Sequence, residues 1–144
     1  VTGGFGFAYE HLPQESSVYR YRAGINASRS HYDNDLAFNK ALQTIWELIS
    51  AGNKYIDETA PWALAKEESQ RERLGTVMYN LLEAQRIIAL LVAPFMPDTA
   101  SKILEILGCD KDDVSLEGRD QWGGLQAGMT IDKAQPLFPR IEAE

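Results

Sequence analysis

Apolar residues recur at helical spacing in the first half of the chain. The first such set repeats at intervals of three, four and seven: Leu42, Ile45, Trp46, Ile49 and Ile56. This pattern predicts an amphipathic helix over about residues 34 to 58, with one buried stripe and Gly52 inside it. Because Trp46 falls on the same stripe as Leu42 and Ile49, it is expected in the core.

A second helix is predicted from about Glu68 to Ala93. Its apolar face is expected to consist of Leu74, Met78, Leu81, Ile88, Leu91, Val92 and Phe95. The charged residues Arg71, Arg73, Glu83 and Arg86 are interpreted as a solvated edge. Pro94 and Pro97 should end this helix, and Asp98 is expected to cap a third helix that stops at Gly108.

Between the first two helices, polar groups precede a proline and a tryptophan. Asn53 and Asp57 are four residues apart and share one helix face, while Pro61 is expected at the first position of a short turn through Lys66, with Thr59 as its cap. From spacing alone, the Trp62 indole fits either of two roles. It can fill the core at a helix start, or it can stack on a planar ligand such as an unpaired base.

The chain after Cys109 has no helical periodicity. The segments Trp122–Leu125 and Pro136–Pro139 alternate turn formers with bulky apolar groups, which predicts an irregular tail that returns and fills gaps between helices. The acidic group at 110, 112 and 113 lacks the glycine and glutamate positions of a calcium loop, so no metal site is expected. Cys109 is interpreted as a small filler.

Size and charge limit the function. The 144 residues fit one domain, no apolar run is long enough to span a membrane, and one cysteine cannot form an internal disulfide, so a cytoplasmic location is expected. The net charge of −7 is unusual for a nucleic-acid module, most of which carry a basic patch. Any RNA binding should therefore be weak in the isolated chain and depend on phosphate contacts from other domains.

Residues 53–66, with the sequence NKYIDETAPWALAK, resemble the signature of the anticodon-binding helical domain of methionyl-tRNA synthetase. Further matching segments follow the family's order: FNKAL at 38–42, WELI at 46–49, APFMP at 93–97, WGGL at 122–125 and PLFPRI at 136–141. The resemblance covers about residues 33 to 144. Residues 1–32 are interpreted as an atypical leader, flexible or rearranged.

The resemblance implies an all-α anticodon-binding bundle whose irregular C-terminal tail packs back on the helices. It implies that Trp62 stacks on an anticodon base, that Pro61 fixes its approach, that Asn53 contacts a base edge or shapes the pocket, and that Asp57 orients its neighbours. The implied partners are methionine tRNA and the catalytic domain of a parent ligase, which would bind ATP and methionine. No cofactor, metal or catalytic residue is expected in this chain, which should be inactive alone.

The leader departs from the pattern of the family. In its members, a helix that leads into the bundle carries an asparagine and, four residues later, an arginine. Both of these residues contact the anticodon. Here Asn26 and Arg29 are only three apart. Aromatic and basic residues alternate over 19–22, a pattern that single strands favour. The alternative function is a protein-interaction or assembly module that has lost its anticodon readers. An enzyme acting alone is improbable, because His11 and His31 have no nucleophile at a suggestive spacing.

Overall fold

A computed structural model describes residues 38–112, 114, 119, 121–131 and 133–141. All regular secondary structure in this part of the chain is helical, which confirms the predicted all-α class. In chain order, the elements are α2 (Phe38–Thr59), α3 (Pro61–Leu64), the 3₁₀ helix η2 (Glu68–Gln70), α4 (Arg71–Val92) and α5 (Pro97–Ile106). The predicted leader, residues 1–32, lies outside the described residues, and so do Asn26, Arg29 and residues 19–22, for which predictions were made.

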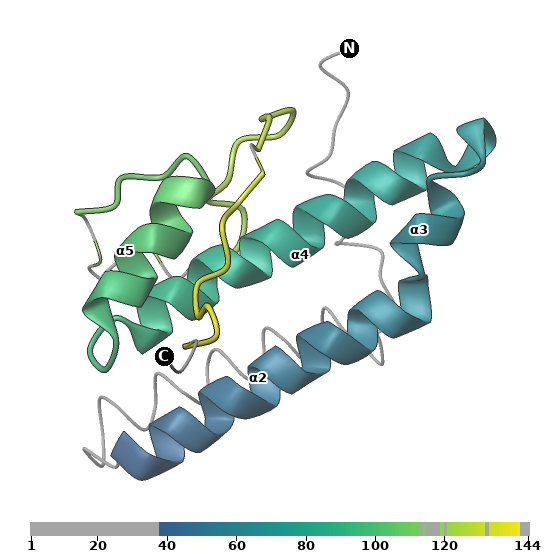
Figure 1. The fold of residues 1–144 in the computed structure, drawn as a ribbon. Coiled ribbons are helices and arrows are strands. Elements are labelled where there is room, and N and C mark those ends of the chain that lie inside the picture. The colour runs from purple at the N-terminus through teal and green to yellow at the C-terminus, as the bar shows by residue number, and fades with distance from the viewer. Residues whose placement is uncertain (1–37, 113, 115–118, 120, 132, 142–144) are drawn as a thin grey trace.

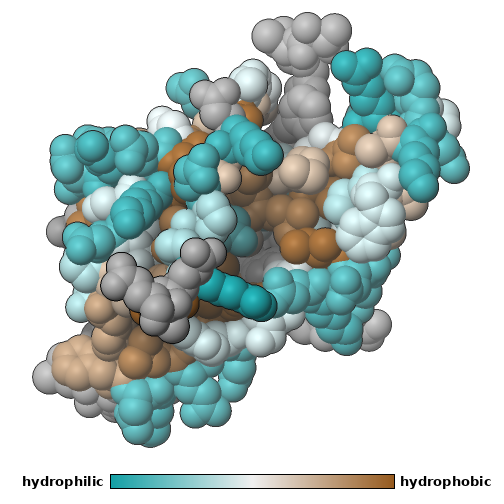
Figure 2. All heavy atoms as spheres, in the orientation of Figure 1, coloured by the Kyte–Doolittle hydropathy of each residue, from teal (hydrophilic) through white to brown (hydrophobic). Residues whose placement is uncertain are grey.

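Helix α4 is the centre of the arrangement (Figure 1). Helix α2 lies beside it and runs in the opposite direction, with α3 joining the two at one end, and α5 packs against the other half of α4. Hydrophobic residues gather over the middle of the molecule, along α4, whereas hydrophilic residues gather at the end where α4 begins (Figure 2). Among the helices that the structure describes, none is apolar over a length that would cross a bilayer.

The buried side of α2 is formed by Ala41, Ile45, Leu48 and Tyr55. The prediction that Trp46 belongs to this stripe was wrong, because its side chain is 51% exposed. Successive residues of an α-helix are turned by about 100°, so the neighbour of the fully buried Ile45 points well away from α4. Leu42 and Ile49 are half-buried, which places Trp46 beyond the edge of the buried stripe.

Helix α4 changes character along its length. Its first turns are exposed or half-buried, with Met78 of the predicted apolar face 41% exposed, whereas residues 86–93 are all buried. The prediction that Glu83 and Arg86 form a solvated edge was wrong, since they are 0% and 5% exposed. The second half of this helix is covered on several sides by α2, α5 and the tail, and its charged residues are buried as well.

Two of the predicted helix ends are confirmed. Helix α4 ends at Val92 before Pro94, and α5 ends just before Gly108, whose φ of 69° suits glycine. The N–H groups of Gly108 and Cys109 donate to the carbonyls of Glu105 and Leu104 at 3.0 and 2.8 Å, which closes a Schellman motif. The predicted Asp98 cap was wrong: α5 begins one residue earlier, at Pro97, and Asp98 lies in its first turn with no side-chain cap.

The irregular tail packs back on the helices at Trp122–Leu125, as predicted. The prediction that Pro136–Pro139 also fills a gap between helices was wrong, because three of its four residues are exposed and Phe138 is 70% exposed. Leu125 is buried, and Trp122 packs partly buried against the main core cluster. The Tyr79 hydroxyl on α4 donates to the Leu125 carbonyl at 3.0 Å. At the start of α2, the Phe38 and Phe95 rings meet edge to face with centroids 6.1 Å apart.

Candidate nucleic-acid interface

The corner between α2 and α3 is made by a single residue with unusual backbone geometry. Ala60 has φ 43° and ψ 62°, the left-handed conformation, and its carbonyl accepts the N–H of Ala63 at 2.8 Å. Pro61 occupies the first position of α3, as predicted, where its fixed φ favours a helix start and its missing N–H costs nothing. The left-handed residue reverses the chain, and the proline starts the next helix at once.

The predicted cap of α3 was wrong. The Thr59 hydroxyl donates to the Tyr55 carbonyl four residues back, at 2.6 Å, and so belongs to the last turn of α2. Among the described residues, no side chain caps α3. The corner is therefore set by the backbone of Ala60 and by Pro61.

A buried contact between helices fixes the end of α2 on which the candidate residues stand. The Tyr55 hydroxyl accepts a hydrogen bond from the Asn80 side-chain amide at 3.2 Å, and both side chains are buried. Tyr55 lies between Asn53 and Asp57 in the sequence and points to the opposite side of the helix. The core side of this turn is thus held on α4, while Asn53 and Asp57 on its other side are exposed.

The four candidate residues lie on this corner with different exposures. Asn53 and Asp57 are exposed on one face of α2, and Pro61 is half-buried. The Trp62 side chain is 56% exposed, so it does not fill the core. Next to them, Lys54 and Glu58 form an exposed ion pair at 3.6 Å. The corner presents an amide, a carboxylate and an indole to solvent, which are groups able to hydrogen-bond a base edge and stack on its face.

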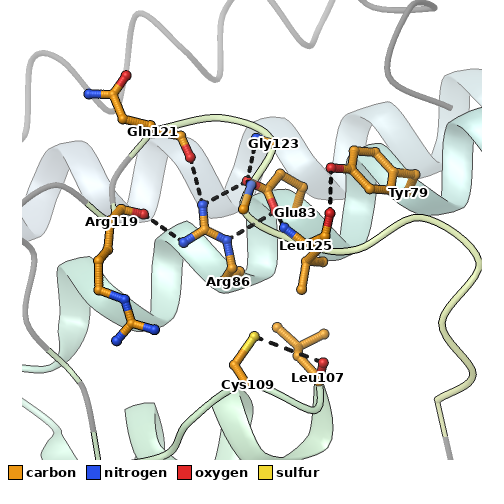
Figure 3. Close-up of polar contacts among 10 residues, drawn as sticks. Tyr79, Glu83, Arg86, Leu107, Cys109, Arg119, Gln121, Gly123 and Leu125 are labelled. Carbon is orange, nitrogen blue, oxygen red and sulfur yellow. Dashed lines mark hydrogen bonds and ion pairs between the residues drawn. The ribbon is translucent and has the colours of Figure 1, made fainter. Parts of the chain in front are cut away.

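The most highly connected polar group in the described residues lies elsewhere, on α4 (Figure 3). The Glu83 carboxylate accepts two hydrogen bonds from the Arg86 guanidinium, at 2.7 and 3.0 Å. It also accepts the backbone N–H groups of Gly123, Gly124 and Leu125, at 2.8, 2.9 and 3.1 Å. One buried side chain thus binds three consecutive amides of the tail.

Arg86 completes this arrangement from the other side of its guanidinium. It donates to the carbonyls of Arg119 and Gln121 at 2.6 and 2.7 Å. We call Glu83, Arg86 and the backbone groups they bind the tail clamp. At Gly124, an added Cβ would lie 2.5 Å from the Arg86 Cζ, so only glycine allows this close approach. The tail clamp recognises backbone rather than side chains, which explains why a stretch rich in glycine suits it.

The tail clamp changes the proton affinity of Glu83. Burial alone raises the pKa of this carboxyl, but the hydrogen bonds from Arg86, Gly124 and Gly123 and the Arg86 charge outweigh it and hold the pKa below its ordinary value of 4.5. Burial raises the pKa of the nearby Cys109 thiol above its ordinary value of 9.0, although the charges of Arg86 and Arg119 oppose the rise. Its thiolate fraction at neutral pH is therefore small, which fits the predicted filler role.

Sequence reasoning missed the tail clamp, although the sequence carries a signal for it. Glu83 and Arg86 are three apart and lie within a run that is otherwise almost wholly apolar, from Leu81 to Val92. Charged side chains that lie among so many apolar residues are expected on the buried side of the helix, where they must be paired internally.

Acidic side chains after α5 form a local turn. The Asp110 carboxylate accepts the backbone N–H of Asp112 at 3.0 Å. In the part of the chain described, no group of three or more histidine, cysteine, aspartate or glutamate residues is arranged to hold a metal ion.

Comparisons with known proteins agree with the observed fold. A family model described as the anticodon-binding domain of methionyl tRNA ligase matches residues 11–144. The methionine–tRNA ligase of Caldanaerobacter subterraneus subsp. tengcongensis is 50% identical over 113 residues, which cover 78% of this chain and 18% of the relative. That of Enterococcus faecalis is 40% identical over 139 residues, covering 96% and 21%.

The fold matches a solved member of the same group. The free-state methionyl-tRNA synthetase of Mycobacterium tuberculosis superposes with a TM-score of 0.76 at 29% identity, over 92% of this chain and 27% of that one. The chain spans about a fifth of the length of the two curated relatives, 18% and 21%. By the match of the family model over residues 11–144, the chain belongs to the family of anticodon-binding domains of methionyl tRNA ligases.

Proposed function

We propose that this chain binds the anticodon loop of methionine tRNA for a parent methionine–tRNA ligase. The observation that carries the proposal is the half-exposed Trp62 on the corner after Ala60 and Pro61, in a chain of this family. An indole with more than half of its surface in water lacks the favourable free energy of burial. An unpaired base stacked on it would remove part of this apolar surface from water.

Each of the four corner residues has a role in this proposal. Trp62 stacks on an anticodon base, and Pro61 sets the direction of the indole. Asn53 donates to or accepts from a base edge, because a carboxamide has both kinds of group. Asp57 orients its neighbours and does not meet the phosphates, since two negative charges repel.

The corner is rigid enough for such a role. The Tyr55–Asn80 hydrogen bond holds the last turns of α2 on α4, and the left-handed Ala60 is followed directly by the proline. A platform that is ordered before binding loses less conformational entropy when the base arrives. The phosphate contacts must come mainly from the parent enzyme, because the chain has a net charge of −7.

The test uses the chain joined to its parent catalytic domain. Trp62→Ala should lower kcat/KM for methionine tRNA by roughly ten- to a hundredfold, the loss of one base stack of about 1 to 3 kcal/mol. Methionine-dependent exchange of pyrophosphate into ATP should not change, because that reaction needs no tRNA. Trp62→Phe should restore part of the loss, since a smaller stacking face remains.

Phe138→Ala is the matched control, because this aromatic side chain is 70% exposed and lies in the tail. It should leave both reactions unchanged. Equal kcat/KM for tRNA in the wild-type and Trp62→Ala enzymes would remove the anticodon role from this corner. It would favour the alternative of a protein-interaction module.

A further inference from the structure

The exposed face of α2 carries a second tryptophan in line with the proposed site. Trp46 is 51% exposed, almost as much as Trp62 at 56%. Tryptophan is usually well buried, so a half-exposed indole on a regular helix is unusual. Its neighbour Ile45 is fully buried, which shows that α2 is seated firmly and that Trp46 faces outward because of its position on the helix.

Helical geometry places Trp46 on the same line as the two α2 residues of the proposed site. Asn53 follows Trp46 by seven residues and Asp57 follows it by eleven. At 3.6 residues per turn these intervals are close to two and three full turns, so the three side chains leave the helix in nearly the same direction. All three are exposed. The rise from Trp46 to Asn53 is about 10 Å, or roughly the height of three stacked bases.

The chemistry of this line is that of a base-binding surface. Asn39, Ser50 and Asn53 are exposed and uncharged, and they lie on the same side of α2 as Trp46. Amides and hydroxyls hydrogen-bond base edges, and an indole stacks on any base regardless of its identity. Of the groups named on this line only Asp57 is charged, so the surface fits base faces better than phosphates or a charged peptide.

We propose that Trp46 stacks on a second unpaired nucleotide of the same RNA loop, so that the binding surface extends along α2 from the corner to Trp46. This inference rests on the proposed function. Trp46 contributes affinity that is independent of base identity, because stacking discriminates little between bases. The reading of the anticodon stays with the corner.

The test measures binding of a fluorescently labelled RNA hairpin, carrying the methionine anticodon loop, to the parent enzyme by fluorescence anisotropy. Trp46→Ala should weaken binding roughly tenfold, and Trp46→Phe should weaken it less. The loss should be the same for a hairpin with one anticodon base changed. Glu47→Ala is the control, since Glu47 is exposed on α2 next to Trp46 but is turned by about 100° from it.

A series of hairpins, each with one loop base removed to leave an abasic site, locates the stacked nucleotide. At that position, Trp46→Ala should have no further effect, because the base it would stack on is already missing. Coupling to one loop position supports the proposal. If Trp46→Ala is coupled to no loop position, the proposal is overturned. This outcome includes the case in which Trp46→Ala weakens binding only by loosening the helices. Circular dichroism and the Trp46→Phe variant would reveal that case.

The result is distinguishable from failure of the proposed function. If Trp62→Ala weakens hairpin binding and Trp46→Ala does not, the extended surface is wrong and the anticodon role of the corner stands. If neither variant weakens binding, both proposals fail. If Trp46→Ala lowers methionine-dependent pyrophosphate exchange without changing hairpin binding, Trp46 contacts the catalytic domain, and the proposed stacking is overturned.

Discussion

The Glu83 carboxylate and the Arg86 guanidinium lie one turn apart on α4, 2.7 Å from each other, and both are almost completely removed from solvent. Such a pair contributes to stability only when its remaining hydrogen-bonding groups are also satisfied. Here they are satisfied by the backbone of the tail, whose amides bind Glu83 and whose carbonyls bind Arg86 (Figure 3). Helix and tail therefore depend on one another.

We predict that Glu83→Ala lowers the free energy of unfolding by about 3 to 5 kcal/mol, because it leaves a buried arginine and three tail amides without their acceptor. Urea denaturation followed by circular dichroism measures the loss. The matched control is Glu68→Ala, since Glu68 also pairs with an arginine three residues on, at 3.1 Å, but both of these side chains are at least 80% exposed. That variant should unfold at nearly the wild-type midpoint. Equal losses in the two variants would contradict a special role for the tail clamp.

Stability should also depend on pH through Glu83. The folded pKa of this carboxyl lies below the 4.5 of the unfolded chain, so folding favours its ionised form. The contribution is fully present above about pH 4.5 and is lost as the pH falls through the folded pKa. Thermal melts between pH 7 and pH 2 should show Tm falling below about pH 4.5. The fall should be shallower in Glu83→Gln, which cannot ionise, and an unchanged acid limb would contradict this assignment.

Gly124→Ala should destabilise the protein, because its Cβ would meet the Arg86 guanidinium at 2.5 Å and force the tail away from α4. We expect a loss of about 1 to 3 kcal/mol, the usual range for overpacking a close contact. The effect should not add to that of Glu83→Ala, since both changes release the same tail amides. Full additivity in a double-mutant cycle would show that the two residues act independently.

Two adjacent residues of α2 should respond very differently to truncation. Ile45→Ala should cost about 2 to 5 kcal/mol, because Ile45 is fully buried and its loss leaves a cavity. Trp46→Ala removes a larger side chain but should change the unfolding midpoint much less, since half of the indole is already in water. Trp62→Ala should resemble Trp46→Ala. A loss at Trp46 as large as that at Ile45 would mean that the indole is part of the core.

Cys109 should react slowly with thiol reagents in the folded protein, because burial raises the pKa of its thiol above the ordinary 9.0. The rate of labelling at pH 8 should be well below that of free cysteine. In denaturant it should rise to the rate of an unstructured peptide. Fast labelling of the folded chain would identify an activated thiolate.

Much of the fold follows from local pattern. The helical spacing of apolar residues predicted α2, α4 and α5, Pro94 and Gly108 marked two helix ends correctly, and Pro61 marked the start of α3. These features depend on single residues and their immediate neighbours. Proline lacks an N–H and glycine can adopt positive φ without steric cost, so their effects on helix ends can be predicted without knowing the tertiary structure.

The errors share a different cause. Trp46 and Ile45 are both apolar and adjacent, and Glu83 and Arg86 have the spacing of a surface ion pair. Which of them is buried depends on where α4, α5 and the tail lie around each helix, and the helical period alone cannot tell the centre of a stripe from its edge. Thr59 and Asp98 are both residue types that cap helices. However, Thr59 lies in the last turn of α2, before α3 begins, and Asp98 lies inside the first turn of α5.

By itself, the sequence determined the all-α class, the three main helices, the returning tail and the corner at Pro61, because each depends on short-range pattern or on a run of residues that resembles a known family. Only the tertiary structure decided that Trp46 faces solvent and that Glu83 and Arg86 bind the tail from within the core. Burial is a property of packed elements, and a carboxylate can bind the amides of residues 40 to 42 positions away only after the chain has folded back upon it.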